Sequence, residues 1–409
     1  MTTARARLIY SVATLFLVVL FLEGALNGLA AISDNVARLV LPKGQISQVP
    51  MFFPDERLAF RPNPEFAGHD ASGFRNAQVP ESADIVVFGD SQTYGHGVSR
   101  EQAWPMALGR ASSVGTYSLA FNGFGPTQSL VLLDRALELK PRVVLQAFYA
   151  GNDLFDGWDA VYGRGVFPEF ESSDSAVLTA MAEAEAEEPL RDRIDRLFQW
   201  QPPGATSKSV SLRAMLRRHS RLYGLLRSTR KALQGSDVDR QWALLKAGID
   251  SGESAMMAFE DGHIRTAFTA EYRLCALELE DPRISEGLRV GLEVLDDVRE
   301  GVESAGAQFV VVWIPTKEYV FRGRVAARRD SYEGVFAKLI EREERVRERV
   351  AHWCEAAGLL LVDVGPGLEE ALEMTFQPYP ASQDGHPNAI GHAAIADVVA
   401  EELRARGIL

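Results

Sequence analysis

Five short apolar runs, rich in β-branched residues, lie along the chain and are separated by stretches of helical character. They are Ile85–Phe88, Thr116–Phe121, Val143–Phe148, Phe309–Ile314 and Leu359–Val364. Strands that are apolar throughout and alternate with helices are typical of a parallel sheet covered on both faces. Polar or glycine-containing turns follow the runs, and in an open α/β sheet this carboxyl edge is where ligands bind. The pattern therefore predicts an α/β domain with a site at that edge.

The N-terminal residues follow a different pattern. Arg5 and Arg7 precede an apolar run without charge, Leu8–Leu22. A helix of that length spans roughly 22 Å, less than the roughly 30 Å of a bilayer's hydrocarbon core. Extension to residue 32 supplies the missing length but includes Glu23. This carboxylate would cost about 2.5–3.5 kcal/mol at mid-bilayer, unless it lies near the interface or faces a partner.

Residues 1–32 are therefore predicted to form an N-terminal transmembrane helix. The positive flank orients the N-terminus toward the cytoplasm and the rest of the chain outside it, in a periplasmic or extracellular location. A cleaved signal peptide, with Gly28-Leu29-Ala30 as the processing site, is the alternative and would give a secreted protein. Both interpretations export the remainder of the chain.

Four regions follow from the pattern. The N-terminal segment is followed by an extended lead-in, residues 33–80, which we expect to pack on a later domain. Residues 81–165 and 285–409 form the α/β domain, interrupted by a mainly helical insert, residues 166–284. Within the insert, Glu171–Glu188 is rich in Ala and Glu and is either a solvated helix or a mobile segment. Lys208–Lys231 has eight basic residues and no acidic one, typical of a solvated helix face or of a patch for lipid headgroups or an acidic glycan.

Composition excludes two classes of protein. A formal net charge of −13 argues against a general nucleic-acid binder, because phosphates require a positive field. The chain has two cysteines, Cys275 and Cys354, too few for a disulfide scaffold or a thiolate metal site. One bridge between them and two free thiols both stay open. We predict no metal site and no cofactor, because His69, His96 and His352 have no companion at metal-ligand spacing.

Residues suited to acyl transfer follow the predicted strands. Such an enzyme needs a nucleophile, a base, a group that orients the base, and donors for the oxyanion. Ser91 stands at a sharp strand-to-helix turn, and His386 precedes the last predicted helix. Asp384 lies two residues before that histidine and is the candidate for orienting it. The backbone N–H groups of Ser91 and Gly123, with the side-chain amide of Asn152, are the candidate oxyanion donors.

These residues resemble the four marker blocks of the SGNH/GDSL hydrolases, in the same order. The blocks are Gly89-Asp90-Ser91, Asn122-Gly123, Gly151-Asn152-Asp153 and Asp384-Gly385-His386-Pro387-Asn388. Two further segments resemble membrane-anchored bacterial members of the family: Gly73-Phe74-Arg75-Asn76 and Ile314-Pro315-Thr316-Lys317-Glu318. The resemblance covers roughly residues 60–165 and 285–409. It implies a three-layer flavodoxin-like sheet with strand order 2-1-3-4-5 and ester chemistry without a metal.

One departure concerns the last block. Many members of the family have two residues between the Asp and the His, whereas this chain has Gly385 alone. The shorter spacing resembles that of members that include polysaccharide O-acetylation proteins. It requires the Asp384 carboxylate to reach His386 through a tighter turn, and the alternative role for Asp384 is helix capping.

Other polar residues are weighed against ordinary structural roles. Asp90 and Asp153 flank the candidate site, and hydrogen bonds that stabilise their turns account for both. Lys317 follows the fourth strand at the ligand edge and is a candidate substrate-binding residue, with a surface or salt-bridged lysine as the alternative. His392, one turn after His386, is expected to pack the terminal helix.

The resemblance implies an exported serine hydrolase that cleaves an acyl ester, such as an acetyl ester, through an acyl-enzyme on Ser91. The first alternative is an O-acyltransferase that passes the acyl group to a cell-envelope polysaccharide with the same residues. The second is an envelope assembly factor that binds polysaccharide or protein without catalysis. The predicted partners are an acyl-ester or carbohydrate substrate and, through the N-terminal helix, a membrane; no nucleic acid is expected. Acyl length and oligomeric state stay open at this point.

Overall fold

The computed structural model describes residues 2–32, 49–198, 220, 222–223, 225, 237–252, 254, 256–328, 333–374 and 376–409. The chain divides into two units, and each is described by itself. One contains residues 1–50 and 202–244, and the other contains residues 51–201 and 245–409. The basic segment 208–231 lies outside the described residues, apart from positions 220, 222, 223 and 225.

The first unit contains the N-terminal helix α1, Thr2–Ile32. Its one carboxylate, Glu23, accepts hydrogen bonds from the Ser220 hydroxyl at 2.9 Å and from the Leu222 backbone N–H at 3.0 Å. Within the described residues, no helix has both the length and the apolar character that a membrane span requires. The transmembrane anchor stays a prediction.

The second unit is built around a five-stranded sheet of order β4-β3-β5-β8-β9, in which all neighbours are parallel. The strands are β3 (Ile85–Phe88), β4 (Thr116–Ser118), β5 (Val143–Tyr149), β8 (Gln308–Ile314) and β9 (Leu360–Asp363). All five predicted strands are present, and their order is the 2-1-3-4-5 arrangement expected from the resemblance. The parallel sheet of the predicted fold class is therefore confirmed.

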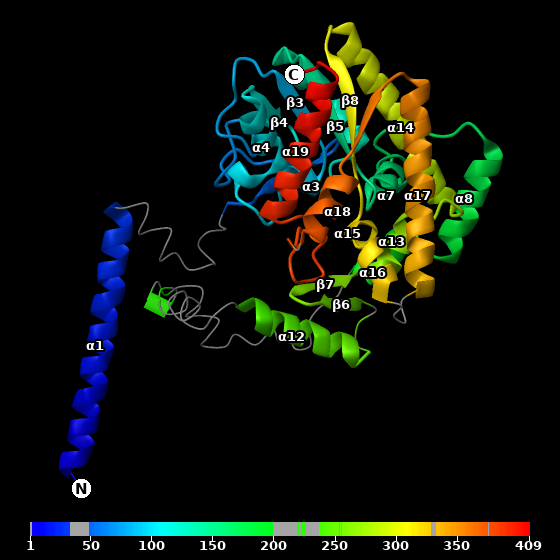
Figure 1. Cartoon of the computed structure of the whole chain (residues 1–409). Helices are drawn as coiled ribbons and strands as arrows, with labels where there is room; N and C mark the ends of the chain where they lie inside the picture. Colours follow the sequence, from blue (N-terminus) through cyan, green and yellow to red (C-terminus); the bar gives the residue numbers. More distant parts are fainter. Residues whose placement is uncertain are drawn as a thin grey trace. The chain divides into compact units, whose positions relative to one another are not determined.

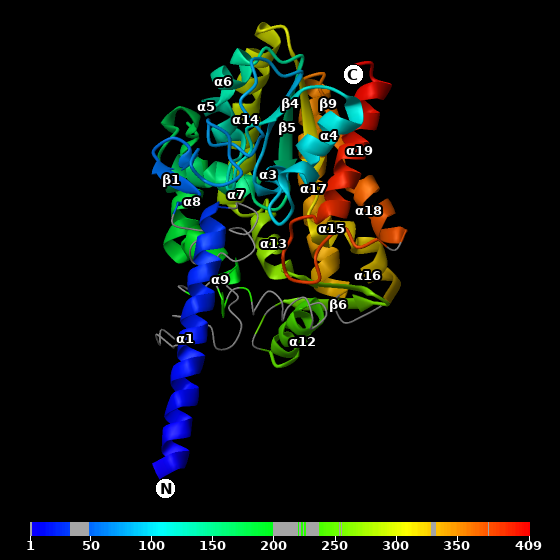
Figure 2. The same cartoon turned by 90° about the vertical axis from the view of Figure 1, so that its left-hand side faces the viewer.

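Helices cover both faces of this sheet, as Figures 1 and 2 show. Successive side chains of a strand point to opposite faces. Val86 and Phe88 accordingly belong to the core under α5 (Pro126–Val131), α7 (Asp153–Trp158) and α14 (Pro282–Ser304). Ile85 and Val87 belong to the opposite core, under α4 (Trp104–Ser112) and α19 (Ala389–Ala405). Because both faces are buried, the strands are predominantly apolar, and β3 is apolar at every position.

The described residues form further helices. They are α3 (Ser91–Tyr94), α6 (Leu133–Glu138), α8 (Ser175–Glu187), α9 (Leu190–Phe198), α12 (Asp237–Asp250), α13 (Ala270–Ala276), α15 (Lys317–Val320), α16 (Arg322–Arg328), α17 (Glu333–Ala356) and α18 (Gly365–Glu373). The acidic segment 171–188 is thus largely the helix α8. Short helical turns are present at Arg100–Gln102, Asp159–Gly163 and Pro168–Phe170.

The insert contains an antiparallel hairpin that the sequence analysis missed. The insert, residues 166–284, is predicted to be mainly helical, but Met257–Asp261 (β6) and Ile264–Phe268 (β7) pair as strands. Two residues separate the strands, and the first, Gly262, has φ +61°. An Asp-Gly dipeptide between apolar segments is a strong hairpin signal. Asp261-Gly262 is such a dipeptide and marks the turn.

The lead-in also forms a hairpin, β1 (Phe52–Asp55) with β2 (Ala59–Pro62). Beyond it the chain packs on the sheet domain, as predicted. The Asn76 side chain accepts a hydrogen bond from the Ser118 N–H at 2.9 Å and donates to the Ser118 carbonyl at 3.0 Å. Through these bonds the lead-in is attached to the edge strand β4.

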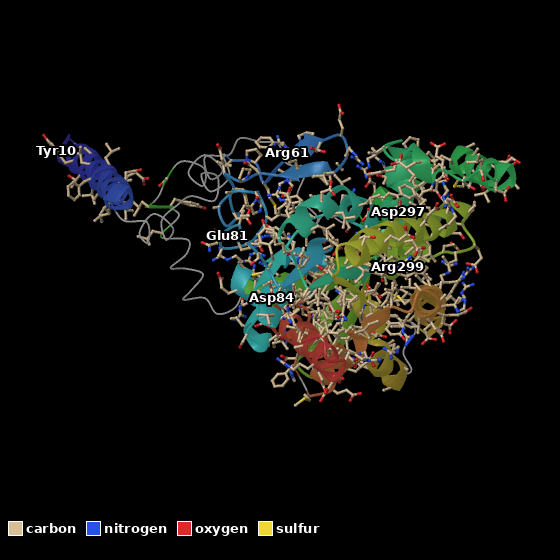
Figure 3. The ribbon with its side chains drawn as sticks, turned by 90° about the horizontal axis from the view of Figure 1, so that it is seen from above. Tyr10, Arg61, Glu81, Asp84, Asp297 and Arg299 are labelled. Atoms are coloured by element: carbon tan, nitrogen blue, oxygen red, sulfur yellow. The ribbon has the colours of Figure 1, made fainter. Side chains whose placement is uncertain are left out.

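The amino edge of the sheet is occupied by charged groups. Asp84 precedes β3 and accepts a hydrogen bond from the Arg142 side chain, which precedes β5, at 3.2 Å. Figure 3 shows Asp84 in the view from above, with Asp297 and Arg299 on α14. The candidate functional residues lie at the other, carboxyl edge.

Candidate active site

Ser91 lies where β3 turns sharply into α3. Gly89 makes the turn with φ +154°, and a Cβ there would stand 2.4 Å from Thr93 Oγ1. Only glycine fits without displacing a neighbour. Asp90 caps α3 by accepting a hydrogen bond from the Gln92 N–H at 2.9 Å. The turn role predicted for Asp90 is confirmed.

Arg75, from the lead-in, fixes the other end of α3. Its guanidinium donates to the carbonyls of Tyr94 at 3.1 Å, Gly95 at 2.6 Å and Val98 at 2.6 Å. It also lies over the Tyr94 ring, 4.9 Å from the centroid. The last carbonyls of a helix have no partner within the helix, and here one side chain satisfies them. This contact gives the Gly73–Asn76 segment its structural role.

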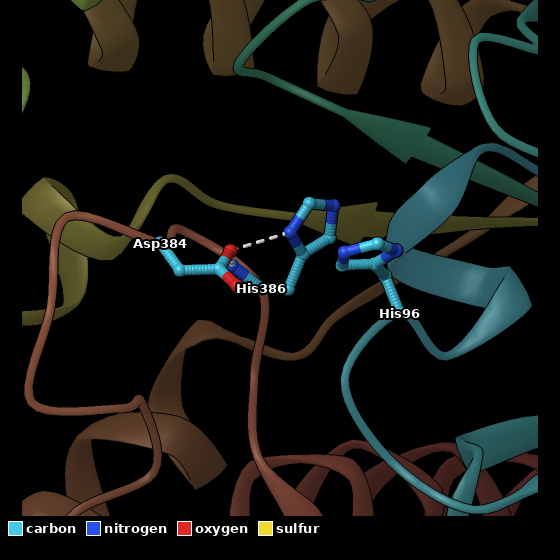
Figure 4. Close-up of side chains that lie close together, drawn as sticks. All are labelled: His96, Asp384 and His386. Atoms are coloured by element: carbon cyan, nitrogen blue, oxygen red, sulfur yellow. Dashed lines mark hydrogen bonds and ion pairs between the residues drawn. The ribbon is translucent and has the colours of Figure 1, made fainter. Parts of the chain in front are cut away.

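His386 and Asp384 meet Ser91 in one hydrogen-bonded chain. Nε2 of His386 lies 2.7 Å from Ser91 Oγ, and Nδ1 of His386 lies 2.6 Å from Asp384 Oδ1. Figure 4 shows the imidazole between the carboxylate and a second histidine, His96. Asn388 caps α19 by accepting a hydrogen bond from the Ile390 N–H at 2.9 Å. The sequence pattern therefore identified three residues that the structure brings together from distant parts of the chain.

The tight turn at Gly385 does not prevent the contact between Asp384 and His386. Oδ1 of Asp384 accepts both the ring Nδ1–H and the backbone N–H of His386, the latter at 3.0 Å. Burial alone would raise the pKa of Asp384, but the hydrogen bonds and the charge of His386 lower it to about 2. The group is therefore a carboxylate at neutral pH. Asn388 caps the helix instead, so the alternative capping role for Asp384 is wrong.

The predicted oxyanion donors line the same cleft as this chain. The cleft has a volume of about 550 Å³, and Ser91, Gly123, Asn152 and His386 are among its lining residues. Gly123 has φ +70°, and a Cβ there would meet only the Phe60 ring, at 3.7 Å. The Asn152 amide Nδ2 donates to Asp156 at 2.5 Å, which holds the side chain in the cleft wall.

Buried carboxyl groups lie beneath the oxyanion donors. Desolvation raises the pKa of Asp90 to about 6 and that of Asp156 to about 7, and it raises the pKa of Asp153 well above its ordinary value. Asp153 accepts a hydrogen bond from the Tyr149 N–H at 2.9 Å, which is the turn role predicted for it. Burial therefore favours the protonated form of Asp153, whereas Asp90, with a pKa of about 6, is mostly ionised at neutral pH.

The insert supplies much of the cleft wall. Ile194 on α9, Met256 before β6 and Tyr272 on α13 line it, together with Phe155 on α7. Arg273, also on α13, lies in the wall and is almost fully buried. None of these residues is among the predicted site residues, because their position relative to the cleft depends on how the insert folds.

His96 has a different place from the one expected. The sequence shows no companion for it at metal-ligand spacing, but its ring lies 4.8 Å from that of His386 and lines the cleft. The ligand atoms of His96, Asp384 and His386 lie within 4.8 Å of one another. Both ring nitrogens of His386 are already hydrogen-bonded, one to Asp384 and the other to Ser91, so we assign no metal to the group.

Lys317 is not a substrate-binding residue, and it is not on the surface either. The side chain is fully buried, does not line the cleft, and donates to three backbone carbonyls. The prediction from its place at the ligand edge was wrong, because the residue begins α15 and turns beneath the loop of Asp384.

The other predictions about single residues concern packing. His392 is buried, and its Nδ1 accepts a hydrogen bond from the Trp104 N–H at 3.3 Å, so its predicted role in packing α19 is confirmed. His69 contacts the Asn63 carbonyl at 2.8 Å and the Tyr94 hydroxyl at 2.9 Å. Cys275 and Cys354 are both buried free thiols.

Comparisons with known proteins give distant structural similarities only. No family model and no curated protein matches the chain. A solved protein described as a lipolytic member of the G-D-S-L family from Desulfitobacterium hafniense DCB-2 has 12% identity and a TM-score of 0.34, covering 78% of this chain and 97% of that one. An alpha/beta hydrolase from the Lake Arreo metagenome has 13% identity and a TM-score of 0.31, with coverage of 81% and 98%.

A third similar structure is a carbohydrate esterase family 2 enzyme with a carbohydrate-binding domain from Corynascus thermopiles (Myceliophthora fergusii). It has 12% identity and a TM-score of 0.31, covering 85% of this chain and 76% of that one. Similarity at this level establishes neither family nor activity for the chain. The geometry of the site has to support any function.

Proposed function

We propose that the protein is a serine ester hydrolase of the SGNH/GDSL type, which forms an acyl-enzyme on Ser91. One observation carries the proposal: an unbroken hydrogen-bonded chain from Asp384 through His386 to Ser91, with contacts of 2.6 and 2.7 Å, at the rim of a cleft. Nucleophile, base and orienting group within hydrogen-bond reach are the signature of an activated serine.

The proposed reaction follows from this arrangement. Ser91 Oγ attacks the ester carbonyl while His386 Nε2 takes the hydroxyl proton, and the Asp384 carboxylate stabilises the imidazolium that forms. The oxyanion receives hydrogen bonds from the N–H groups of Ser91 and Gly123 and from the Asn152 amide. His386 then returns the proton to the leaving alcohol. Water, activated by the same histidine, attacks the acyl-enzyme and regenerates the serine.

We also propose that the enzyme acts outside the cytoplasm, tethered by α1. The apolar composition of Leu8–Leu22 and the preceding Arg5 and Arg7 support this location. Fractionation of cells expressing the full chain tests it: detergent is expected to be required for release, and external protease is expected to digest the catalytic unit. Release of a soluble, shortened protein would instead support cleavage of the segment.

The catalytic proposal is tested with Ser91→Ala and with Ser175→Ala as the matched control. Ser175 is an exposed serine at the start of α8. Turnover of p-nitrophenyl acetate is expected to fall to background in the first variant and to stay at the wild-type level in the control. A fluorophosphonate probe should label Ser91, as identified by peptide mass spectrometry. Undiminished turnover by Ser91→Ala would contradict the proposal, and labelling without turnover would indicate a different ester.

Hydrolysis and transfer to a sugar hydroxyl use the same residues and differ in the acceptor. The discriminating measurement is the partition of a radiolabelled acetyl group between water and added polysaccharide acceptors. We expect free acetate to predominate across the acceptors. Acylated glycan forming faster than free acid would assign the protein to acyl transfer, with the role of Ser91 unchanged.

A further inference from the structure

The segment Thr316-Lys317-Glu318 at the carboxyl end of β8 has no part in the proposed reaction, although all three side chains are buried. Burial of an ammonium and a carboxylate is costly unless each is fully hydrogen-bonded. Such a pair at the ligand edge of the sheet therefore requires an explanation.

Lys317 is bonded at every donor. Its Nζ lies 2.7 Å from the Ala267 carbonyl and 3.1 Å from the carbonyls of both Ser382 and Asp384. An ammonium has three N–H donors, so three acceptors satisfy it completely. Two of the acceptors belong to the loop that carries Asp384, and the third belongs to strand β7 of the insert hairpin.

The insert hairpin is also bonded directly to this loop. The Ser382 carbonyl accepts from the Ala267 N–H and from the Thr266 hydroxyl, both at 3.2 Å. Gln377 pairs with the backbone of Arg265, accepting at 2.9 Å and donating at 2.8 Å. Strand β7 is therefore hydrogen-bonded to the Asp–His loop, residues 377–388, and Lys317 is hydrogen-bonded to both.

Glu318 supports the opposite side of the cleft. It accepts from the Thr269 N–H at 2.8 Å and from the Thr269 hydroxyl at 3.2 Å, and it pairs with Arg273 at 3.6 Å. Arg273 in turn donates to the carbonyl of Gly151 at 2.9 Å, one residue before the oxyanion donor Asn152. A Cβ at Gly385 would stand 2.9 Å from the Arg273 guanidinium, so this cation also lies against the Asp–His loop.

We propose that Lys317 is a positioning residue, which holds the Asp–His loop against the insert hairpin so that Asp384 and His386 stay aligned with Ser91. Glu318 pairs with Arg273, and Arg273 in turn holds the backbone next to the oxyanion donor Asn152. The inference rests on the proposed function and deepens it. The insert helps to hold the catalytic residues in place. Two adjacent residues that follow β8, Lys317 and Glu318, position the Asp–His loop and the oxyanion donors.

The test compares Lys317→Met, which keeps the unbranched shape and most of the length of the side chain but removes its donors, with Lys338→Met. Lys338 is an exposed lysine on α17 and is the matched control. We expect Lys317→Met to lower kcat by about 100-fold, because misplacement by 1 Å costs on that order. KM is expected to change less than threefold, since Lys317 does not line the cleft. The control should match wild type in both parameters.

Hydrogen exchange of the peptide covering residues 377–388 provides the structural readout. It should be faster in Lys317→Met than in the control, with exchange in β3 and β5 unchanged. Unchanged exchange in this peptide would overturn the proposal, and so would faster exchange with an unchanged rate of Ser91 labelling by fluorophosphonate. If the wild-type protein itself fails to label, the proposed function is wrong, and the exchange data still decide whether Lys317 holds the loop.

Thr266→Val keeps the inference testable if Lys317→Met does not fold. This isosteric change removes a single hydroxyl donor to the Ser382 carbonyl. We expect kcat to fall about threefold to tenfold, with a smaller increase in exchange of the same peptide. Wild-type kcat and exchange in Thr266→Val would contradict the role of the insert hairpin.

Discussion

Replacement of Asp384 by Asn tests the proposed mechanism most directly, because it removes the charge of this residue while its hydrogen bonds to His386 can be kept. In serine proteases the equivalent change costs about 10⁴ in kcat, since the amide imposes the wrong histidine tautomer. Here the same oxygen, Oδ1, accepts both the ring Nδ1–H and the backbone N–H of His386. An asparagine turned with its NH₂ toward these groups would face two donors. It should therefore keep its carbonyl oxygen there and preserve the tautomer.

The expected loss is then the attraction between a carboxylate and the imidazolium. For unit charges about 4 Å apart, this is about 1 kcal/mol in water and about 4 kcal/mol at an effective dielectric constant of 20. The side chains of His386 and Asp384 are 24% and 38% exposed, so the value lies between these limits. About 2–3 kcal/mol corresponds to a fall in kcat of about 30- to 150-fold. Asp384→Ala, which also loses both hydrogen bonds, should cost on the order of 10⁴.

Steady-state hydrolysis of p-nitrophenyl acetate by the two variants measures this difference, with Asp297→Asn on the exposed face of α14 as the control. Because the pKa of Asp384 is lowered to about 2, this group is ionised in the wild type throughout the assay range, and the variants are compared with the wild type at a single pH of 8. Equal losses in Asp384→Asn and Asp384→Ala would refute the reasoning, since they would mean that the amide has reoriented. Less than a threefold loss in both would remove Asp384 from the mechanism.

Three further predictions follow from the site. Asn152→Ala should lower kcat by about 10²–10³ with a small change in KM, because one oxyanion donor is lost; stopped-flow acylation that is unaffected would contradict this. Arg75→Leu removes three guanidinium hydrogen bonds to carbonyls at and just beyond the end of α3 and should lower the free energy of unfolding by about 3 kcal/mol in urea titrations, whereas a change below 0.5 kcal/mol would be inconsistent with it. Burial lowers the pKa of Lys317 to about 8, against opposing charges on Glu318 and Asp384 and with Arg273 reinforcing it. Between about pH 8 and 10.5 the unfolded chain keeps a proton that the folded chain has lost, so this group raises stability with pH. Activity should nevertheless fall above pH 8 as one donor to the loop disappears; a wild-type alkaline profile identical to that of Lys317→Met would contradict the assignment.

The sheet and the reacting groups were predictable from local signals. Strands buried on both faces are predominantly apolar, so Ile85–Phe88 and Val143–Tyr149 are recognisable without knowledge of their partners. The carboxyl ends of parallel strands share one edge. This rule alone brings Ser91 and Asn152 to the same side of the sheet, and the resemblance of the terminal block adds His386.

The support of the site was not predictable in this way. The prediction of a mainly helical insert fails at residues 257–268, because a short apolar run does not distinguish a strand from a helix. The dipeptide Asp261-Gly262 is the one local signal of the hairpin turn. The role of Lys317 was misjudged for a related reason. A lysine at the ligand edge suggests a substrate contact, and only the position of Ala267, Ser382 and Asp384 around its Nζ gives it another role.

The amino-acid sequence by itself indicated the chemistry that we propose for this protein, because the nucleophile and the oxyanion donors follow strands and the base lies in the terminal block that resembles the SGNH/GDSL hydrolases. Tertiary structure alone decided how the site is held and what shapes its cleft. The framework consists of contacts between residues far apart in the chain, such as Lys317 with Ala267 and Arg273 with Gly151. Their energies depend on burial and on exact donor–acceptor distances, and neither quantity is encoded in local spacing.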